Sequence, residues 1–272
     1  MKKCFVSVVT NYYYLEGLKV LATSLAESKT SYPLVVVIPD DLDDNFNNAC
    51  KNIKHVFDVI KMPRIDFGDL KYDDNPSFDH LKDTFFKLSV ASLIQFEKII
   101  MLDTDLLVLN NIDSLFEYPH MSATRCGSIG HPEWTGVLLN SGLLVLEPSI
   151  HLFKSLVNTA KGIILNNKDN GPIGDQDVFC ALYPNWNNCK ELQIPEQYNE
   201  YYLYAGKLAK TLKRKWKDIY VLHFWGKNKP WSLTPKELFI QSIRYVKSKR
   251  IDLARCTMLY RKFLIKSKKE NK

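Results

Sequence analysis

The sequence predicts an α/β protein with a mainly parallel central sheet. Short apolar runs alternate with segments of helical periodicity along the first half of the chain, as in βαβ units. The run at residues 99–102 is apolar at four consecutive positions, which is typical of a strand buried on both faces of a parallel sheet. The chain has 272 residues, which is enough for one large domain or two small ones.

The first half of the chain is expected to contain three strands with helices between them. Residues 4–9 and 34–38 are apolar runs that stop at polar or proline positions, and residues 55–60 are a third candidate strand. Apolar residues between positions 15 and 25 recur at helical spacing. Asp40 follows the second strand directly and is therefore a candidate helix cap.

The next segment of the chain is expected to be a long loop. Residues 63–83 lack periodicity and contain several turn residues, and loops of this length in compact domains are commonly functional. Helices are predicted at residues 84–96 and 149–167, and a strand at 98–102. No transmembrane segment is expected, because no run approaches the roughly 20 apolar residues that a spanning helix needs. The six cysteines have no metal-binding or disulfide spacing, which favours reduced thiols and a cytoplasmic protein.

Positive charge is concentrated near the C-terminus. The net charge is +7, and residues 244–272 hold eleven Lys or Arg against two acidic residues. We expect a main domain at 1–243 and a basic, helical tail at 244–272, whose packed face would contain Ile251, Ala254, Met258, Leu259 and Phe263. The tail and a second basic run at 207–217 are expected to be solvated helix faces, with an anionic surface as the alternative partner. No nucleic-acid partner is expected, because no nucleic-acid motif accompanies these runs.

The most informative segment for function is Asp103-Thr104-Asp105, which follows the buried strand. Open α/β sheets bind ligands outside the carboxyl ends of their strands. Residues two apart in an extended chain point the same way, so both carboxylates can converge on one divalent cation. The alternative is a turn in which the aspartates cap a helix.

A second polar segment, at residues 223–231, follows a predicted strand at 219–222. His223 is a candidate third metal ligand, although a single His at a strand end is commonly structural. Gly226 would let a phosphate approach the backbone, and Lys229 would supply positive charge.

Seven short motifs in order make the chain resemble glycosyltransferase family 8, and within it the glycogenin-like members. They are Val8-Val9-Thr10-Asn11 with Tyr14 and Gly17, Thr84 with Phe86-Lys87-Leu88, Asp103-Thr104-Asp105, Asn111-Ile112-Asp113 with Leu115-Phe116, Asn140-Ser141-Gly142, Gly174-Asp175-Gln176, and HFxGxxKPW at 223–231. The resemblance implies a GT-A fold, which is a Rossmann-like nucleotide-binding domain. It also implies a retaining hexosyltransferase that takes glucose from UDP-glucose.

The resemblance further implies a role for each motif residue. The metal ligands would be Asp103, Asp105 and His223, and the uridine part of the donor would contact Thr10, Asn11 and Tyr14. The phosphates and sugar would contact Thr104, Gly226, Lys229 and Lys87. The transferred sugar would lie among Asn140, Ser141, Asp175 and Gln176, which with Lys87 form the catalytic set. Two carboxylates and an imidazole suit Mn²⁺ better than Mg²⁺, which remains the alternative.

Two questions of chemistry stay open at this point. Retention could proceed through a covalent adduct, for which Asp175 is the candidate nucleophile, or by same-face attack within an ion pair, which we favour. The acceptor could be a tyrosine of this chain, a separate glycan or a polyol. The position at which the family carries its acceptor tyrosine falls at Gly206, with Tyr201, Tyr202 and Tyr204 as nearby candidate acceptors.

The donor and the assembly are also open. Phe78 stands where the family carries an arginine, so another UDP-hexose is an alternative donor. A homodimer is expected by resemblance. The competing hypothesis from another class is a non-catalytic scaffold that binds sugar nucleotide.

Overall fold

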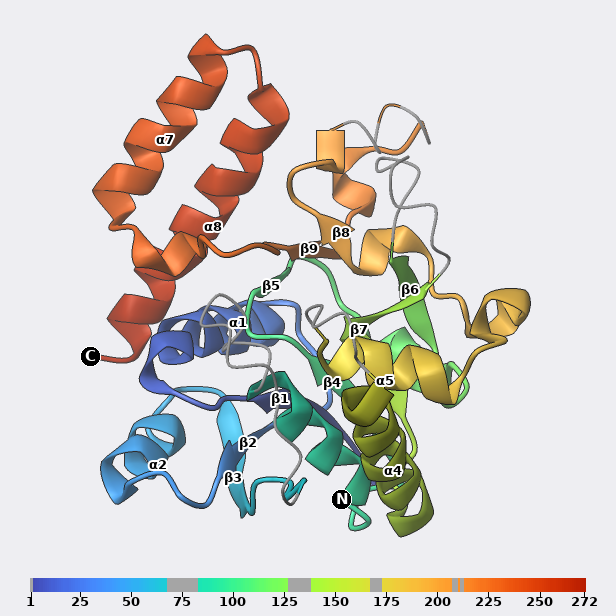
Figure 1. Cartoon of the computed structure of the whole chain (residues 1–272). Helices are drawn as coiled ribbons and strands as arrows, with labels where there is room; N and C mark the ends of the chain where they lie inside the picture. The colour runs from blue at the N-terminus through green and yellow to red at the C-terminus, as the bar shows by residue number, and fades with distance from the viewer. Residues whose placement is uncertain (1, 68–82, 127–137, 167–172, 207–209, 211–212) are drawn as a thin grey trace.

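The computed structural model describes residues 2–67, 83–126, 138–166, 173–206, 210 and 213–272. These residues form a six-stranded sheet in the order β3-β2-β1-β4-β7-β6 and a three-stranded sheet in the order β5-β9-β8 (Figure 1). Strands β1 to β4 pair in parallel, while β7 runs antiparallel to both β4 and β6. The expected α/β fold with a mainly parallel sheet is confirmed.

The strands of the described chain are β1 (Lys3–Val8), β2 (Leu34–Pro39), β3 (Val56–Met62), β4 (Lys98–Leu102), β5 (Leu106–Val108), β6 (Ala123–Cys126), β7 (Leu138–Leu146), β8 (Glu200–Tyr201) and β9 (Val221–His223). The α-helices are α1 (Leu15–Glu27), α2 (Asp44–Lys51), α4 (Ile150–Asn166), α5 (Asp175–Leu182), α7 (Pro235–Lys247) and α8 (Ile251–Glu270). Each strand expected from the sequence is present, with ends shifted by one or two residues.

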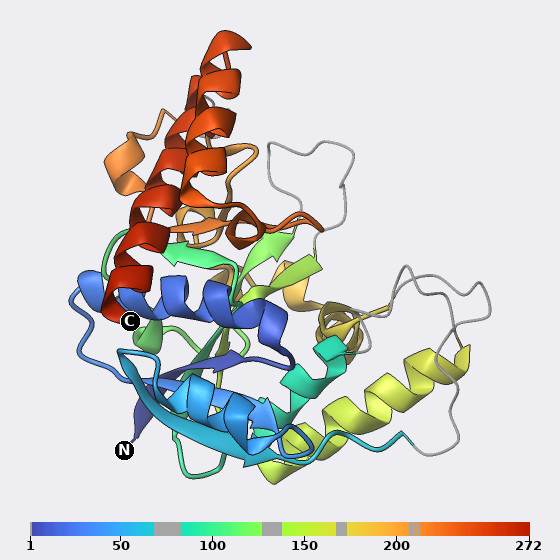
Figure 2. The ribbon, with the colours of Figure 1, turned by 90° about the vertical axis from the view of Figure 1, so that its left-hand side faces the viewer.

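The large sheet is buried on both faces because its strands are apolar at successive positions. Phe5 of β1 lies in a core cluster with side chains of α1 and α2. Cys4 and Val6, which point to the opposite face, lie in a second cluster with α4, α5 and the 3-10 helix η3 (Asp83–Ser92). Helices therefore cover both faces of the sheet, as Figure 2 shows from the side.

Two local expectations are corrected by the structure. The helix cap is Asp43 and not Asp40: the Asp43 carboxylate accepts a hydrogen bond from Phe46 N at 2.8 Å, whereas Asp40 N still donates to Met62 O and so extends the sheet pairing. The helix expected at 84–96 is the 3-10 helix η3, which ends at Ser92. The Ser92 hydroxyl donates to Ser89 O there and competes for a carbonyl of the helix. The expected loop at 63–83 lies mostly outside the described residues.

The strand β4 positions the functional segment. Its residues 99–102 are at most 1% exposed, between β1 and β7, and Asp103 follows at the carboxyl end. The chain then turns into β5, which pairs with β9 so that Leu106 lies opposite His223. The small sheet thus brings residue 223 next to residues 103–105.

The chain ends in a hairpin of the helices α7 and α8, which projects from the sheet before α8 descends along α1 (Figures 1 and 2). Residue 244, the expected boundary of the tail, lies inside α7. The packed face of α8 contains Leu253, Cys256 and Tyr260. Ile251 is 60% exposed, so its expected place on the packed face is wrong: it begins the helix at the hairpin tip.

None of the described helices is both long and apolar enough to cross a bilayer. The six cysteines all lie in the described ranges, and all are free thiols.

Candidate active site

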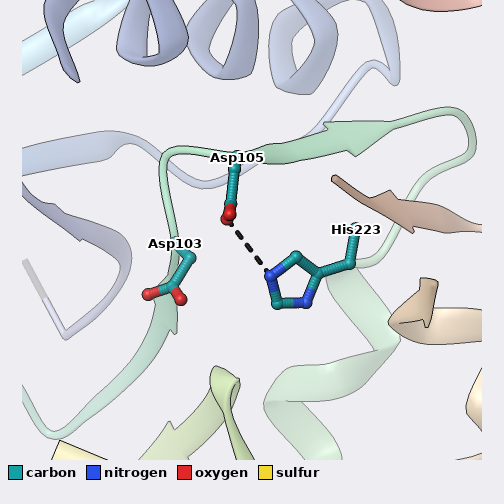
Figure 3. Close-up of side chains that lie close together, drawn as sticks. All are labelled: Asp103, Asp105 and His223. Carbon is teal, nitrogen blue, oxygen red and sulfur yellow. Dashed lines mark ion pairs between the residues drawn. The ribbon is translucent and has the colours of Figure 1, made fainter. Parts of the chain in front are cut away.

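The structure brings Asp103, Asp105 and His223 together at the carboxyl end of β4 (Figure 3). One ligand atom from each side chain can be chosen so that all three lie within 4.8 Å of one another. Asp105 and His223 are 6% and 2% exposed, so their polar atoms are shielded from water. This set of two carboxylates and one imidazole is the expected donor set for a transition-metal dication such as Mn²⁺.

The protonation of His223 is set by Asn199. The Asn199 amide donates through Nδ2 to Asn140 Oδ1 at 2.7 Å and to Thr124 Oγ1 at 3.0 Å, so its Oδ1 faces His223 Nδ1 at 2.9 Å as an acceptor. Nδ1 is therefore the protonated nitrogen, and Nε2 presents its lone pair to the site.

The Nε2 atom of His223 lies 3.2 Å from Asp105 Oδ1 (Figure 3). Both atoms are buried and lack a hydrogen-bond partner among the described residues. Two lone-pair atoms at this distance repel each other unless a proton or a metal cation lies between them. The pair thus fits a shared divalent ion, with Asp103 as the third ligand.

Two lysines balance the carboxylates of the site. Lys87 Nζ lies 2.6 Å from Asp103 Oδ1 and 3.4 Å from Asp175 Oδ2, and Lys229 Nζ lies 2.5 Å from Asp105 Oδ2. Burial alone would favour the neutral amine of Lys87, but Asp103 and Asp175 outweigh it and hold its pKa above the ordinary value. The ammonium group of Lys87 is thus held charged beside the metal position, and Lys229 forms an ion pair with Asp105 there.

The two aspartates differ in their electrostatics. Burial, reinforced by the neighbouring carboxylates, raises the pKa of Asp103 despite the opposing charge of Lys87. Burial also opposes ionisation of Asp105, but the charge of His223, present when its ring is protonated, and the charge of Lys229 outweigh burial and hold the pKa of Asp105 well below its usual range. Three carboxylates face two lysines, which leaves an excess of negative charge that favours the binding of a dication.

A cavity of about 560 Å³ opens beside these residues. This volume is within the usual range of ligand sites. Its described lining includes the metal set, both lysines, and the residues expected to bind the nucleotide, namely Thr10, Asn11, Tyr14, Thr104 and Gly226. Asn11 also accepts a hydrogen bond from Tyr13 N and so caps the short helix at Tyr12–Tyr14. Gly226 has φ +119°, a backbone conformation that favours glycine.

Two motif glycines make room for the site. A Cβ at Gly142 would lie 2.7 Å from His223 Cε1 and 2.9 Å from Asn140 Oδ1. A Cβ at Gly17 would lie 2.8 Å from the Trp231 ring and 2.9 Å from Thr104 O. Both positions therefore exclude larger residues for steric reasons.

The side chains expected around the transferred sugar form a buried polar group next to the cavity. Asn140 donates to Tyr201 OH at 2.8 Å and to Gln176 Oε1 at 3.3 Å, and Ser141 N donates to the same Gln176 oxygen at 3.4 Å. The buried Oδ2 of Asp175 accepts no hydrogen bond from the described residues. It lies 3.4 Å from Nζ of Lys87, which lines the cavity. This group and the metal set are joined by Asn199.

The three candidate acceptor tyrosines lie in different surroundings. Tyr201 is 8% exposed, with its ring centroid 5.3 Å from that of His223, and burial raises the pKa of its hydroxyl. Tyr202 points the other way and stacks on Phe224, while Tyr204 is half-buried. At Gly206 a Cβ would meet Asp252 Cβ of α8 at 2.3 Å, so no side chain fits there.

The site also contains residues that the sequence reasoning missed. Asn199 is one of them. It precedes β8, whose parallel pairing with β9 places Tyr201 opposite His223 and so brings Asn199 within hydrogen-bond distance of the His223 ring. Asp83 lines the cavity and accepts a hydrogen bond from the Thr10 hydroxyl at 3.3 Å. No spacing in the sequence singles out either residue. Phe78, where the family carries an arginine, lies outside the described residues.

Comparisons with known proteins agree with this geometry. The family model described as glycosyl transferase family 8 matches residues 5–124. Glycogenin-1 of Mus musculus is 31% identical over 234 residues, which is 85% of this chain and 66% of the glycogenin. Glycogenin-1 of Homo sapiens is 30% identical over 244 residues, which is 88% of this chain and 66% of the glycogenin. The chain thus spans 66% of the length of either relative.

Solved structures carry the same fold. The galactosyltransferase LgtC, in complex with donor and acceptor sugar analogs, has a TM-score of 0.61 at 17% identity, covering 84% of this chain and 88% of LgtC. The glycosyltransferase GlyE of Streptococcus pneumoniae has a TM-score of 0.56 at 20% identity, covering 85% of this chain and 57% of GlyE. Since sequence, fold and motif geometry agree, the chain belongs to glycosyltransferase family 8, as a glycogenin-like member with the GT-A fold.

Proposed function

We propose that this protein is a Mn²⁺-dependent retaining hexosyltransferase that takes glucose from UDP-glucose. The single observation that carries the proposal is the buried pair of His223 Nε2 and Asp105 Oδ1, 3.2 Å apart at the edge of the cavity. Asp103, Asp105 and His223 would hold the ion, which would neutralise the diphosphate of the donor. Mg²⁺ is the alternative ion.

The residues around the ion suit the charge that develops in the reaction. When the bond between the anomeric carbon and the phosphate oxygen breaks, negative charge builds on the departing UDP. Lys87 and Lys229 each supply a partly buried ammonium group beside the metal position, and neither needs to transfer a proton. The acceptor hydroxyl forms the new bond to the anomeric carbon, and its proton passes to the departing phosphate oxygen.

Same-face attack within an ion pair is the route we propose for retention. The Gln176 amide already accepts hydrogen bonds from Asn140 and Ser141, so it suits positioning of the sugar better than nucleophilic attack. Asp175 is the nucleophile in the alternative route, which its Oδ2 would allow, since this oxygen has an ion pair with Lys87 but accepts no hydrogen bond from the described residues. Trapping of a glycosyl adduct on Asp175 would establish that alternative.

For the acceptor, two candidates differ in their support. Self-glucosylation requires an accessible hydroxyl, and Tyr201 lies closest to the metal set but is 8% exposed. Position 206 is closed by Asp252 of α8. The burial of Tyr201 and the steric block at position 206 favour a separate acceptor, a glycan or a small polyol, over a tyrosine of the same chain.

Intact mass spectrometry tests both statements. Purified protein is incubated with UDP-glucose and Mn²⁺, with and without an added glycan or polyol, and UDP release is followed in parallel. UDP release that depends on the added acceptor, with no gain of hexose mass by the protein, supports the separate acceptor. Hexose mass mapped to Tyr201, Tyr202 or Tyr204 would support self-glucosylation. The absence of UDP release with every donor tried would count against a transferase and favour the scaffold hypothesis. The homodimer, the cytoplasmic location and the division at residue 244 stay predictions.

A further inference from the structure

The outer side of α7 carries large apolar residues that the fold leaves uncovered. Phe239, Ile240, Ile243 and Val246 are 45%, 39%, 40% and 51% exposed. Their spacing places them on one side of the helix. Ile251, the first residue of α8, is 60% exposed as well. Figure 2 shows the hairpin that α7 and α8 form. We call these five residues the apolar stripe.

The apolar stripe is not the side on which α7 packs. Leu238 and Ser242 are 1% and 5% exposed and face the rest of the molecule, where Leu238 joins the cluster around Tyr260 of α8. The helix α7 therefore has two apolar sides, and only one of them packs against other described residues. A helix side that faces only water would carry polar residues at the stripe positions.

Cations surround the apolar stripe. Lys236, Arg244 and Lys247 are exposed on α7. The Arg261 guanidinium lies 5.5 Å from the centre of the Phe239 ring and donates through Nε to Pro235 O at 2.8 Å. Residues 235–272 hold twelve Lys or Arg against three acidic residues, of which Glu237 caps α7 through Thr234.

The combination of positive charge and exposed apolar surface suits one of three possible partners better than the other two. A second copy of this chain would bring two strongly positive hairpins face to face, which like-charge repulsion opposes. An anionic polymer would use the cations but leave the apolar stripe in water. An anionic lipid surface uses both, because apolar side chains enter the boundary between headgroups and acyl chains while Lys and Arg contact the headgroups.

We propose that the α7–α8 hairpin docks this protein on a bilayer surface that contains anionic lipid, with the apolar stripe inserted. The hairpin lies on the membrane and does not span it. Five residues connect Lys229, which lines the cavity of the candidate active site, to Pro235 at the start of α7, so the hairpin follows shortly after the cavity wall in the sequence. The proposal does not depend on the donor or the acceptor.

Vesicle sedimentation tests the proposal with the whole 272-residue chain. Vesicles of phosphatidylcholine alone are compared with vesicles that also contain phosphatidylserine. We expect binding to the mixed vesicles, little binding to phosphatidylcholine, and weaker binding as salt is raised. Ile243→Glu places a charge in the apolar stripe and is expected to lower the partition coefficient by at least about tenfold.

The matched control is Ile94→Glu, since Ile94 is 62% exposed and lies far from the hairpin in sequence. Ile94→Glu should bind vesicles like the unchanged protein, and both variants should keep the far-ultraviolet circular dichroism of the folded chain. Equal binding by Ile243→Glu and the unchanged protein would overturn the proposal, as would equal binding to both kinds of vesicle. Concentration-dependent dimers that Ile243→Glu abolishes, without vesicle binding, would instead identify the stripe as an interface between copies and also overturn it.

Discussion

Replacement of Gly142 by alanine tests how closely the metal ligands are packed. The added Cβ would lie 2.7 Å from His223 Cε1, about 0.7 Å short of ordinary van der Waals contact, which begins at 3.4 Å. Metal–ligand distances tolerate changes of only about 0.2 Å. The imidazole must therefore shift by more than the site can absorb, and Asn140 Oδ1 at 2.9 Å blocks retreat of the methyl group.

The expected consequences are a loss of metal affinity and a modest loss of stability. Displacement of a ligand should weaken Mn²⁺ binding by at least about 10–100-fold, the loss typical when even an outer partner of a ligand is removed. Overpacking should lower the free energy of unfolding by about 1–3 kcal/mol. Isothermal titration with Mn²⁺ measures the first quantity, and denaturant unfolding the second.

The matched control is Gly162→Ala. Gly162 lies inside α4 with no atom within 4 Å of its added Cβ, so the variant should bind Mn²⁺ normally. It should also gain about 0.5–1 kcal/mol of stability, because alanine favours the helix. Wild-type Mn²⁺ affinity in Gly142→Ala would refute the assignment of His223 as a ligand held at this distance.

Three further predictions concern the same region. Asp103→Asn should weaken Mn²⁺ binding in the titration while leaving the far-ultraviolet spectrum unchanged; equal affinity would contradict the ligand set. Asn199→Ala removes the acceptor that fixes the His223 tautomer and should weaken Mn²⁺ binding by about 10–100-fold; nuclear magnetic resonance of the imidazole nitrogens should then report a mixture of tautomers, and an unchanged spectrum would refute the role. Burial raises the pKa of Glu200 from 4.5 to about 7, against the opposing charge of Arg214. The folded chain therefore binds this proton more tightly than the unfolded chain does. As pH rises from 4.5 to about 7, Glu200 lowers the free energy of unfolding. Relative to Glu200→Gln, the unchanged protein should lose up to about 3 kcal/mol over that window; parallel unfolding curves at all pH values would contradict this.

The elements that the sequence predicts well are those whose own residues decide the outcome. Four consecutive apolar residues before Asp103 identify β4 as a central strand, because only a strand buried on both faces suits such a run. The helix α1 is likewise predicted from its own residues, by their helical spacing, and β1 and β2 by their apolar runs. Asp103 and Asp105 then lie at the end of β4 where ligands of such sheets bind.

The parts that the sequence does not predict depend on contacts between distant segments. Asn199 becomes a partner of His223 only through β8, a strand of two residues that local patterns do not reveal. Asp43 replaces Asp40 as the cap because Asp40 remains paired to β3 through Met62. Ile251 has an apolar side chain at helical spacing, but the hairpin exposes it at its tip.

The most direct test of the central claim is the binding of UDP with and without Mn²⁺, measured by isothermal titration on the unchanged protein and on His223→Ala. If Asp103, Asp105 and His223 hold an ion that the diphosphate shares, Mn²⁺ should strengthen UDP binding to the unchanged protein, and this gain should disappear in His223→Ala. UDP binding that is the same in both proteins, whether or not Mn²⁺ is present, would contradict the claim.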